Sequence, residues 1–191
     1  MKSGTLRLSM KPSLVIVGLG NPGQNYDRTR HNVGFRAVDV LSQEYGAGDW
    51  AEKQKFLSQV QEARIVTVPV LLVKPNTYMN CSGDAVQKIV DFFKIDASQQ
   101  IIVLCDDVDL PLGELRMRKK GGPGTHNGLK SLVHIFGEEF TRIRIGLGTS
   151  PAGVDLAAWV LSTFSKDEET AVEDSLKKLP AMIREFVLED G

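Results

Sequence analysis

The chain is poor in the residues that cross-link a protein or hold it in a membrane. Only two of its 191 residues are cysteine, Cys81 and Cys105, and two cysteines alone build neither a disulfide framework nor a zinc cluster. Its longest apolar runs have the length of a strand, and residues 1–12 contain no apolar stretch of signal-peptide length. We therefore expect a soluble protein without a membrane anchor, in a reducing cytoplasm.

The sequence also lacks an excess of charge of either sign. Its 23 Lys and Arg and 24 Asp and Glu give a formal net charge of −1, so any basic surface for nucleic acid must be local. One core serves chains of roughly 100–200 residues, which predicts a single domain. Residues 1–11 are predicted to form a flexible N-terminal extension, and residues 12–191 the folded domain.

The spacing of apolar residues predicts alternating strands and helices. Apolar or alternating runs predict strands at 14–19, 56–63, 70–73, 101–105, 114–119 and 142–147. Apolar stripes at helical spacing predict helices at 31–45, 83–93, 128–136, 154–161 and from 166 onward. Gly46 is expected to end the first helix, Ser82 to cap the second, and Pro180 to interrupt the last. This order predicts an α/β fold: a single-domain mixed, twisted β-sheet with helices packed on both faces.

Four polar segments follow these predicted strands. They are the loop 18–23, the cluster 76–80, the acidic turn 106–109 and the glycine loop, which we define as residues 121–128. Ligands of α/β proteins bind at the carboxyl ends of strands. The four segments therefore predict a single built site.

Histidine is scarce, with three in the whole chain. His31 opens a predicted helix beside the first loop, and Asp106 ends a predicted strand. A carboxylate on one imidazole nitrogen fixes the tautomer and stabilises the protonated ring, so Asp106 is the expected partner of His31. No serine or cysteine stands in a convincing nucleophile context, which indicates direct activation of water. His126 is open to either catalysis or a loop-bracing hydrogen bond, and His134 is expected to be structural.

Two other site types stay open from the residues alone. The loop 18–23 matches a dinucleotide fingerprint, although Pro22 removes a backbone donor and Asp39 falls inside a predicted helix, so a tight structural turn is the competing interpretation. The acidic turn 106–109 offers oxygen ligands for magnesium, while a turn stabilised by Asp and Pro is the simpler alternative.

Basic residues gather on two predicted strands, at Arg116, Arg118, Lys119 and Lys120 and at Arg142 and Arg144. If the strands are neighbours, guanidinium groups on one face could grip a phosphate; a charged, solvated sheet edge is the alternative. The adjacent glycine loop favours the end of an anionic polymer over a whole duplex.

Five segments, taken together and in order, resemble bacterial-type peptidyl-tRNA hydrolases. They are residues 17–32, with Val17-Gly-Leu-Gly-Asn-Pro-Gly23, Tyr26 and Thr29-Arg-His-Asn32; Lys74-Pro-Asn-Thr-Tyr-Met-Asn-Cys-Ser-Gly83; Asp106-Asp-Val-Asp-Leu-Pro111; Gly124-Thr-His-Asn-Gly128; and Arg142-Ile-Arg-Ile-Gly-Leu-Gly148. They extend over nearly the whole chain from Leu14, which makes the set far more specific than any one segment.

The resemblance implies an ester hydrolase that cuts between a peptide and the 3′ end of tRNA, as a monomer, with no cofactor and no metal. Residues 12–191 would be its catalytic domain, and a non-catalytic RNA-binding relative of the same fold is the alternative function. The implied roles are catalytic for His31, Asp106 and Asn21; substrate-binding for Tyr26, Tyr78, Met79, Asn80 and Asn127; and tRNA-phosphate-binding for Arg116, Arg118 and Arg144.

Overall fold

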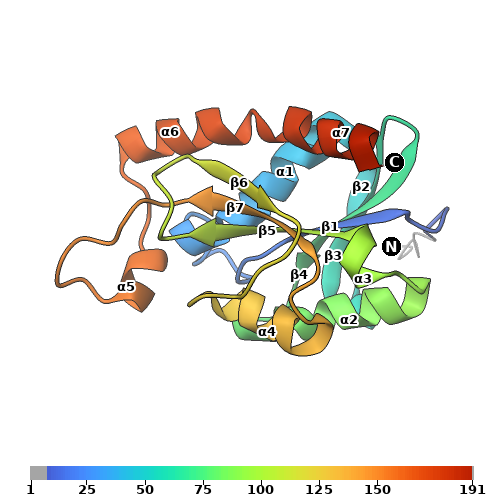
Figure 1. Ribbon diagram of the computed structural model, residues 1–191, viewed down its shortest axis with the longest axis horizontal. Coiled ribbons are helices and arrows are strands. Elements are labelled where there is room, and N and C mark those ends of the chain that lie inside the picture. Colours follow the sequence, from blue (N-terminus) through green and yellow to red (C-terminus); the bar gives the residue numbers. More distant parts are fainter. Residues whose placement is uncertain (1–7, 191) are drawn as a thin grey trace, which may run out of the picture.

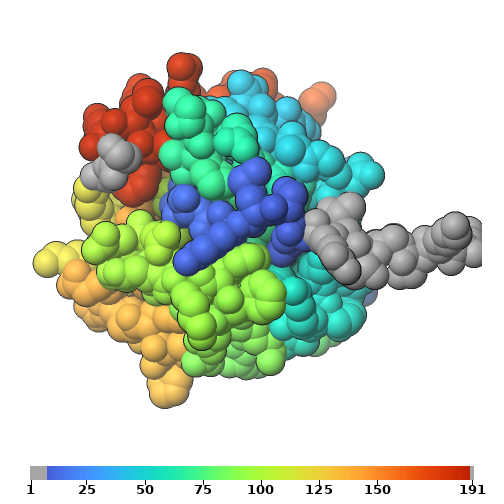
Figure 2. Space-filling model, turned by 90° about the vertical axis from the view of Figure 1, so that its right-hand side faces the viewer, coloured from blue at the N-terminus to red at the C-terminus, as the bar shows by residue number. Residues whose placement is uncertain are grey.

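The computed structural model describes residues 8–190, so residues 1–7 of the predicted extension lie outside it. Residues 8–13 form neither helix nor strand. The Ser9 hydroxyl donates to Glu62 at 2.8 Å, and the Ser13 carbonyl accepts from Gln100 at 3.0 Å. Figure 2 shows this stretch in blue on the end of the molecule that faces the viewer. The division at residue 11 stays a prediction.

A seven-stranded mixed sheet forms the centre of the molecule, in the order β2-β3-β4-β1-β5-β7-β6. β1 runs parallel to β4 and β5, and β5 runs parallel to β7, whereas β2–β3, β3–β4 and β6–β7 are antiparallel pairs. The strands are β1 (Leu14–Gly18), β2 (Gly46–Lys53), β3 (Ser58–Ile65), β4 (Val68–Pro75), β5 (Ile101–Asp107), β6 (Leu115–Arg118) and β7 (Thr141–Gly146).

Helices cover both faces of this sheet, which confirms the predicted α/β fold (Figure 1). One face packs against α1 (Val33–Tyr45), α6 (Lys166–Leu176) and α7 (Leu179–Asp190), and the other against α2 (Ser82–Phe93), α3 (Ala97–Gln100) and α4 (Asn127–Phe136). The short α5 (Leu156–Val160) stands apart at one end. β1 is buried on both faces, because Ile16 joins one core and Val17 the other. No helix within residues 8–190 is long and apolar enough to cross a membrane.

Some local predictions were wrong. Residues 46–53 form the edge strand β2, which the sequence analysis missed because its residues are mostly exposed and do not alternate. Residue 56 lies in a 3₁₀ turn (Gln54–Phe56) that precedes β3. Ser82 is the first residue of α2 rather than its cap, since its hydroxyl donates to the Met79 carbonyl at 2.8 Å. The predicted interruption of the last helix is confirmed, but it lies just before Pro180: α6 ends at Leu176, and α7 begins at Leu179 with Pro180 in its first turn.

The glycines of the loop 18–23 serve helix packing. A Cβ on Gly18 would lie 2.3 Å from the Gly34 carbonyl oxygen, and one on Gly20 would meet the Phe35 ring at 2.7 Å. A Cβ on Gly34 would in turn lie 2.5 Å from the Leu104 carbonyl oxygen of β5. The N-terminal end of α1 therefore sits directly on β1 and β5. This close approach accounts for the fingerprint as a structural turn and brings His31 to the end of β5.

Candidate active site

His31 and Asp106, separated by 75 positions in the chain, are in direct contact. His31 lies in a 3₁₀ turn (Arg30–Asn32) that leads into α1, and Asp106 lies at the carboxyl end of β5. The His31 Nδ1 is 2.9 Å and 3.0 Å from the two carboxylate oxygens. The His31 side chain is 11% exposed and that of Asp106 is 2% exposed, so the pair is shielded from bulk water. The predicted contact is confirmed.

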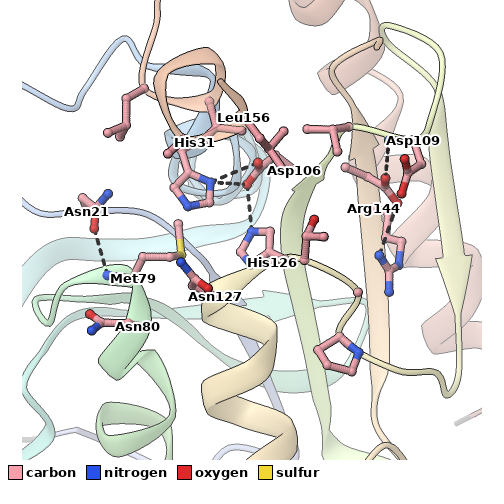
Figure 3. Close-up of a pocket in the computed structure, with 18 of the residues that line it drawn as sticks. Asn21, His31, Met79, Asn80, Asp106, Asp109, His126, Asn127, Arg144 and Leu156 are labelled. Carbon is pink, nitrogen blue, oxygen red and sulfur yellow. Dashed lines mark hydrogen bonds and ion pairs between the residues drawn. The ribbon is translucent and has the colours of Figure 1, made fainter. Parts of the chain in front are cut away.

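A second imidazole also reaches Asp106. His126 Nε2 lies 2.8 Å from Asp106 Oδ1 (Figure 3). His126 Nδ1 accepts the backbone N–H groups of Gly128 at 3.1 Å and Leu129 at 3.2 Å, which caps α4. A neutral imidazole has one donor and one acceptor nitrogen. We therefore assign the proton of His126 to Nε2, and that of His31 to Nδ1, from the hydrogen-bond partners. This assignment leaves Nε2 of His31 unprotonated, with a lone pair that can accept a proton.

The two ionisable groups of the pair shift each other. Burial lowers the pKa of His31 as the largest single effect, but the charge of Asp106 and its hydrogen bond together raise that pKa above 6.5. Burial raises the pKa of Asp106, and the His126 and His31 imidazoles outweigh this and hold that pKa well below its ordinary value. Asp106 is therefore an anion at neutral pH, and it supports a proton on His31.

A cavity of about 540 Å³ opens beside His31. Met79, Asn21, Asn80 and Asn127 lie on its wall and are labelled beside His31 and His126 in Figure 3. The Asn21 Oδ1 accepts the Met79 backbone N–H at 2.8 Å, so Asn21 binds this backbone rather than the His31 ring. The Asn21 Nδ2 group makes no hydrogen bond to any of the described residues. Donors from three side-chain amides can therefore serve a carbonyl oxygen in the cavity.

The two tyrosines lie elsewhere. Tyr26 and Tyr78 contact each other edge to face, with ring centroids 6.4 Å apart, and neither belongs to the residues that line the cavity. Tyr78 is 61% exposed. The structure thus separates the two tyrosines from Met79, Asn80 and Asn127, with which they were grouped.

The two strands that carry the basic residues, β6 and β7, are neighbours in the sheet, as predicted. In the β6–β7 pair Arg116 faces Arg144 and Arg118 faces Arg142, so all four side chains start from one face of the sheet. A hollow of about 320 Å³ lies there, which we call the basic hollow; its basic lining residues are Arg116, Arg118, Lys120 and Arg144. Its position beside the cavity allows one ligand to span both, because Arg144, Asp107 and Asp109 line the two hollows.

Arg142 does not join this hollow. Its side chain is buried and donates to the backbone carbonyls of Gly121, Glu138 and Phe140, so it fixes the start of the glycine loop. Arg144 donates to the Gly122 carbonyl at 2.9 Å and pairs with Asp107 at 3.2 Å. The expectation that both arginines project together is therefore wrong for Arg142, whose guanidinium group is used up on backbone carbonyl oxygens.

Within residues 8–190, the group with metal-ligand spacing is His31, Asp106 and His126. The nitrogen that each imidazole points at the carboxylate carries a proton in the assignment above, and a protonated nitrogen has no lone pair for a metal. We therefore treat the three as hydrogen-bond partners. In the acidic turn, Asp107 accepts the Asp109 backbone N–H at 2.8 Å and pairs with Arg144, which supports the turn interpretation over magnesium.

The sequence analysis missed the side of the cavity that α5 supplies. Leu156, Val160 and Leu161 line it with apolar groups. Arg30, next to His31, holds this segment: its guanidinium lies 3.6 Å from the centre of the Trp159 ring and 2.9 Å from Glu168. In the sequence, Arg30 stands far from Trp159 and Glu168, and no local pattern links these residues.

An imidazole held by a carboxylate at Nδ1 can take a proton at Nε2, and no described serine or cysteine is hydrogen-bonded to His31. The fold and site therefore define a class, that of α/β proteins with a histidine–carboxylate pair at the carboxyl end of a parallel strand. Residues 15–191 match the family model described as peptidyl-tRNA hydrolase, and the chain belongs to this family.

Similar proteins agree with this membership. The chain is 45% identical over 178 residues to the peptidyl-tRNA hydrolase of Chloroflexus aurantiacus, with 93% of each chain covered. It is 43% identical to that of Shouchella clausii, over 92% of this chain and 96% of the relative. The crystal structure of peptidyl-tRNA hydrolase from Acinetobacter baumannii superimposes with a TM-score of 0.84 at 34% identity, covering 95% of this chain and 93% of that one.

Proposed function

We propose that this chain hydrolyses the ester bond between a peptide, or an N-acyl amino acid, and the 3′ end of tRNA. The products are free tRNA and peptide, and the reaction recycles tRNA from aborted translation. The observation that carries the proposal is the 2.9 Å contact of His31 with Asp106 at an amide-walled cavity, in a chain of this family. The proposal includes action as a monomer in the cytoplasm on the acceptor stem and 3′ end of tRNA.

His31 is the proposed general base. Its Nε2 takes a proton from water while the water oxygen attacks the ester carbonyl carbon. The negative oxygen that develops is held by side-chain amide donors, Asn80 and the unpaired Nδ2 of Asn21. The tetrahedral intermediate then breaks the bond to the ribose oxygen, which takes the proton back from His31. Asp106 stabilises the imidazolium in between.

The amide wall also gives a basis for substrate choice. A peptidyl or N-acyl substrate presents a neutral N–H and C=O to Asn80 and Asn127, both of which lie on the cavity wall without a side-chain hydrogen bond among the described residues. A free aminoacyl ester presents an ammonium group instead, which amide donors meet poorly. We therefore propose that the site favours N-blocked substrates.

The direct test compares N-acetyl-aminoacyl-tRNA with free aminoacyl-tRNA, each with and without a chelator. We expect release of N-acetyl-amino acid, at least about tenfold slower cleavage of the free ester, and no change with chelator. The measurement is acid-soluble radiolabel against time. Absence of cleavage would favour the non-catalytic RNA-binding alternative, and loss of activity with chelator would contradict the metal-independent mechanism.

The basic hollow is proposed to bind the 5′-terminal phosphate of the tRNA. Arg118 is exposed at the end of β6 and lines this hollow. Arg118→Ala should raise KM for tRNA substrates about 5–10-fold and flatten the salt dependence by about one phosphate contact. A short ester of the 3′-terminal nucleotides should be cleaved at the unchanged rate, because it does not reach the hollow.

Two further variants serve as controls for the Arg118→Ala measurement. Arg118→Lys keeps the charge and should restore most of the affinity, while Arg64→Ala removes an exposed arginine on β3, at the far side of the sheet, and should change nothing. An equal loss on long and short substrates would show instead that Arg118 supports the fold.

A further inference from the structure

One carboxylate serves two histidines in this site. Asp106 Oδ1 accepts from His31 Nδ1 at 2.9 Å and from His126 Nε2 at 2.8 Å, and the two rings lie 4.9 Å apart (Figure 3). His126 is as well shielded as the pair itself, since its side chain is 7% exposed. The described mechanism uses His31 and Asp106 and gives His126 no task.

The helix cap determines which nitrogen of His126 meets Asp106. Because Nδ1 accepts the N–H groups of Gly128 and Leu129, the proton must sit on Nε2, so His126 is a donor to Asp106 in every state in which the cap is intact. His126 therefore withdraws part of the carboxylate's hydrogen-bonding capacity and charge from His31.

We propose that His126 is a positioning residue that sets the basicity of His31 by sharing Asp106. This inference rests on the proposed function, in which His31 must be neutral to take a proton. A carboxylate with a single imidazole partner would hold the proton of His31 more firmly, and less of the enzyme would be active at neutral pH. By donating a hydrogen bond to the same carboxylate, His126 weakens the stabilisation of protonated His31. His31 still donates from Nδ1 to Asp106, so its Nε2 stays free.

The sign of the pH effect follows. Activity rises with pH as His31 loses its proton, because the neutral ring is the base. Removing the His126 N–H concentrates the charge of Asp106 on His31 and moves this rise to higher pH. The other charged groups that face the cavity are Asp107, Asp109 and Asp155 and, on β7, Arg144, and these stay in place in the variants below.

The wild-type protein provides the first test without any substitution. Imidazole nitrogen chemical shifts measured by NMR should show His31 as the Nδ1–H tautomer and His126 as the Nε2–H tautomer near pH 8. A His126 that carries its proton on Nδ1 would overturn the proposal. This result does not depend on activity, so it separates failure of this inference from failure of the proposed function.

The second test is His126→Asn, which keeps a capping side chain for α4 but has no N–H at the position of Nε2. The acid limb of kcat/KM is expected to shift upward by about 0.5–1 pH unit, with rates about 3–10-fold lower on that limb and close to wild type on the alkaline plateau. The NMR titration of His31 should move by the same amount. His134→Asn removes an exposed imidazole from the same helix and should shift nothing.

Two outcomes of the variant would contradict the proposal. If the rate falls equally at all pH values while the His31 titration stays in place, His126 serves only as the cap. If the limb moves to lower pH, His126 strengthens rather than divides the hold of Asp106. Thermal unfolding of His126→Asn and His126→Ala separates the loss of the cap from the loss of the donor, because only the alanine variant loses both.

Discussion

Replacement of His31 by alanine is expected to lower kcat/KM for N-acetyl-aminoacyl-tRNA by about 10²–10⁴-fold, the usual contribution of a general base. His31 is the one described group whose free nitrogen faces the cavity with a carboxylate behind it, so no neighbouring side chain takes its place. The affinity for tRNA should stay the same, because the basic hollow contains no part of His31. Single-turnover hydrolysis and filter binding measure the two effects separately.

His134→Ala is the matched control, since it removes an exposed histidine at the last turn of α4 and should leave the rate unchanged. The variant His31→Ala should also unfold in a single transition near that of the wild type, which shows that the loss is chemical. Unchanged turnover in the His31 variant would remove this residue from the mechanism. A parallel loss of tRNA affinity would indicate a collapsed site.

The fold was predictable where one physical signal dominated. β1 and β5 are continuous apolar runs because parallel central strands are buried on both faces, and they were placed within about one or two residues. β2 carried no such signal, because an edge strand with most of its side chains in water needs neither alternation nor apolar residues. Its pairing comes from β3, a partner that a local pattern does not contain.

The site was predictable to the extent that it depends on strand ends. The rule that ligands bind beyond the carboxyl ends of parallel strands placed Asp106 near His31, and the structure confirms the contact. The double use of Asp106 was not predictable, because it depends on where the N-terminus of α4 meets β5. The burial of Arg142 was hidden for a similar reason: alternation gives the face of the sheet, and the glycine loop decides which arginine it covers.

Asp106→Asn is expected to lower kcat/KM by about 10²–10⁴-fold, an effect as large as loss of the base itself. Both imidazoles now donate N–H to the carboxylate, and an amide offers only one acceptor oxygen to them. Its NH₂ group instead favours the tautomer of His31 with the lone pair on Nδ1, which places the proton on Nε2 and leaves no base toward the cavity. Substrate affinity should be nearly unchanged.

The same variant tests the electrostatics in the direction opposite to His126→Asn. Asp106 raises the pKa of His31, so its neutralisation should move the acid limb of the residual activity to lower pH. Stability gives an independent measure. The pKa of Asp106 is lowered in the folded state, so its contribution is present above about pH 4 and is lost as the pH falls further. The fall of the unfolding free energy below that pH should therefore be shallower in Asp106→Asn.

Asp91→Asn, an exposed position on α2, serves as the control for both measurements and should reproduce the wild-type profiles. Urea unfolding at several pH values gives the stability curve, and kcat/KM over the same range gives the limb. Opposite shifts in the Asp106 and His126 variants would establish that one carboxylate charge is divided between two imidazoles. Shifts of the same sign would show that His126 acts on His31 by some route other than Asp106.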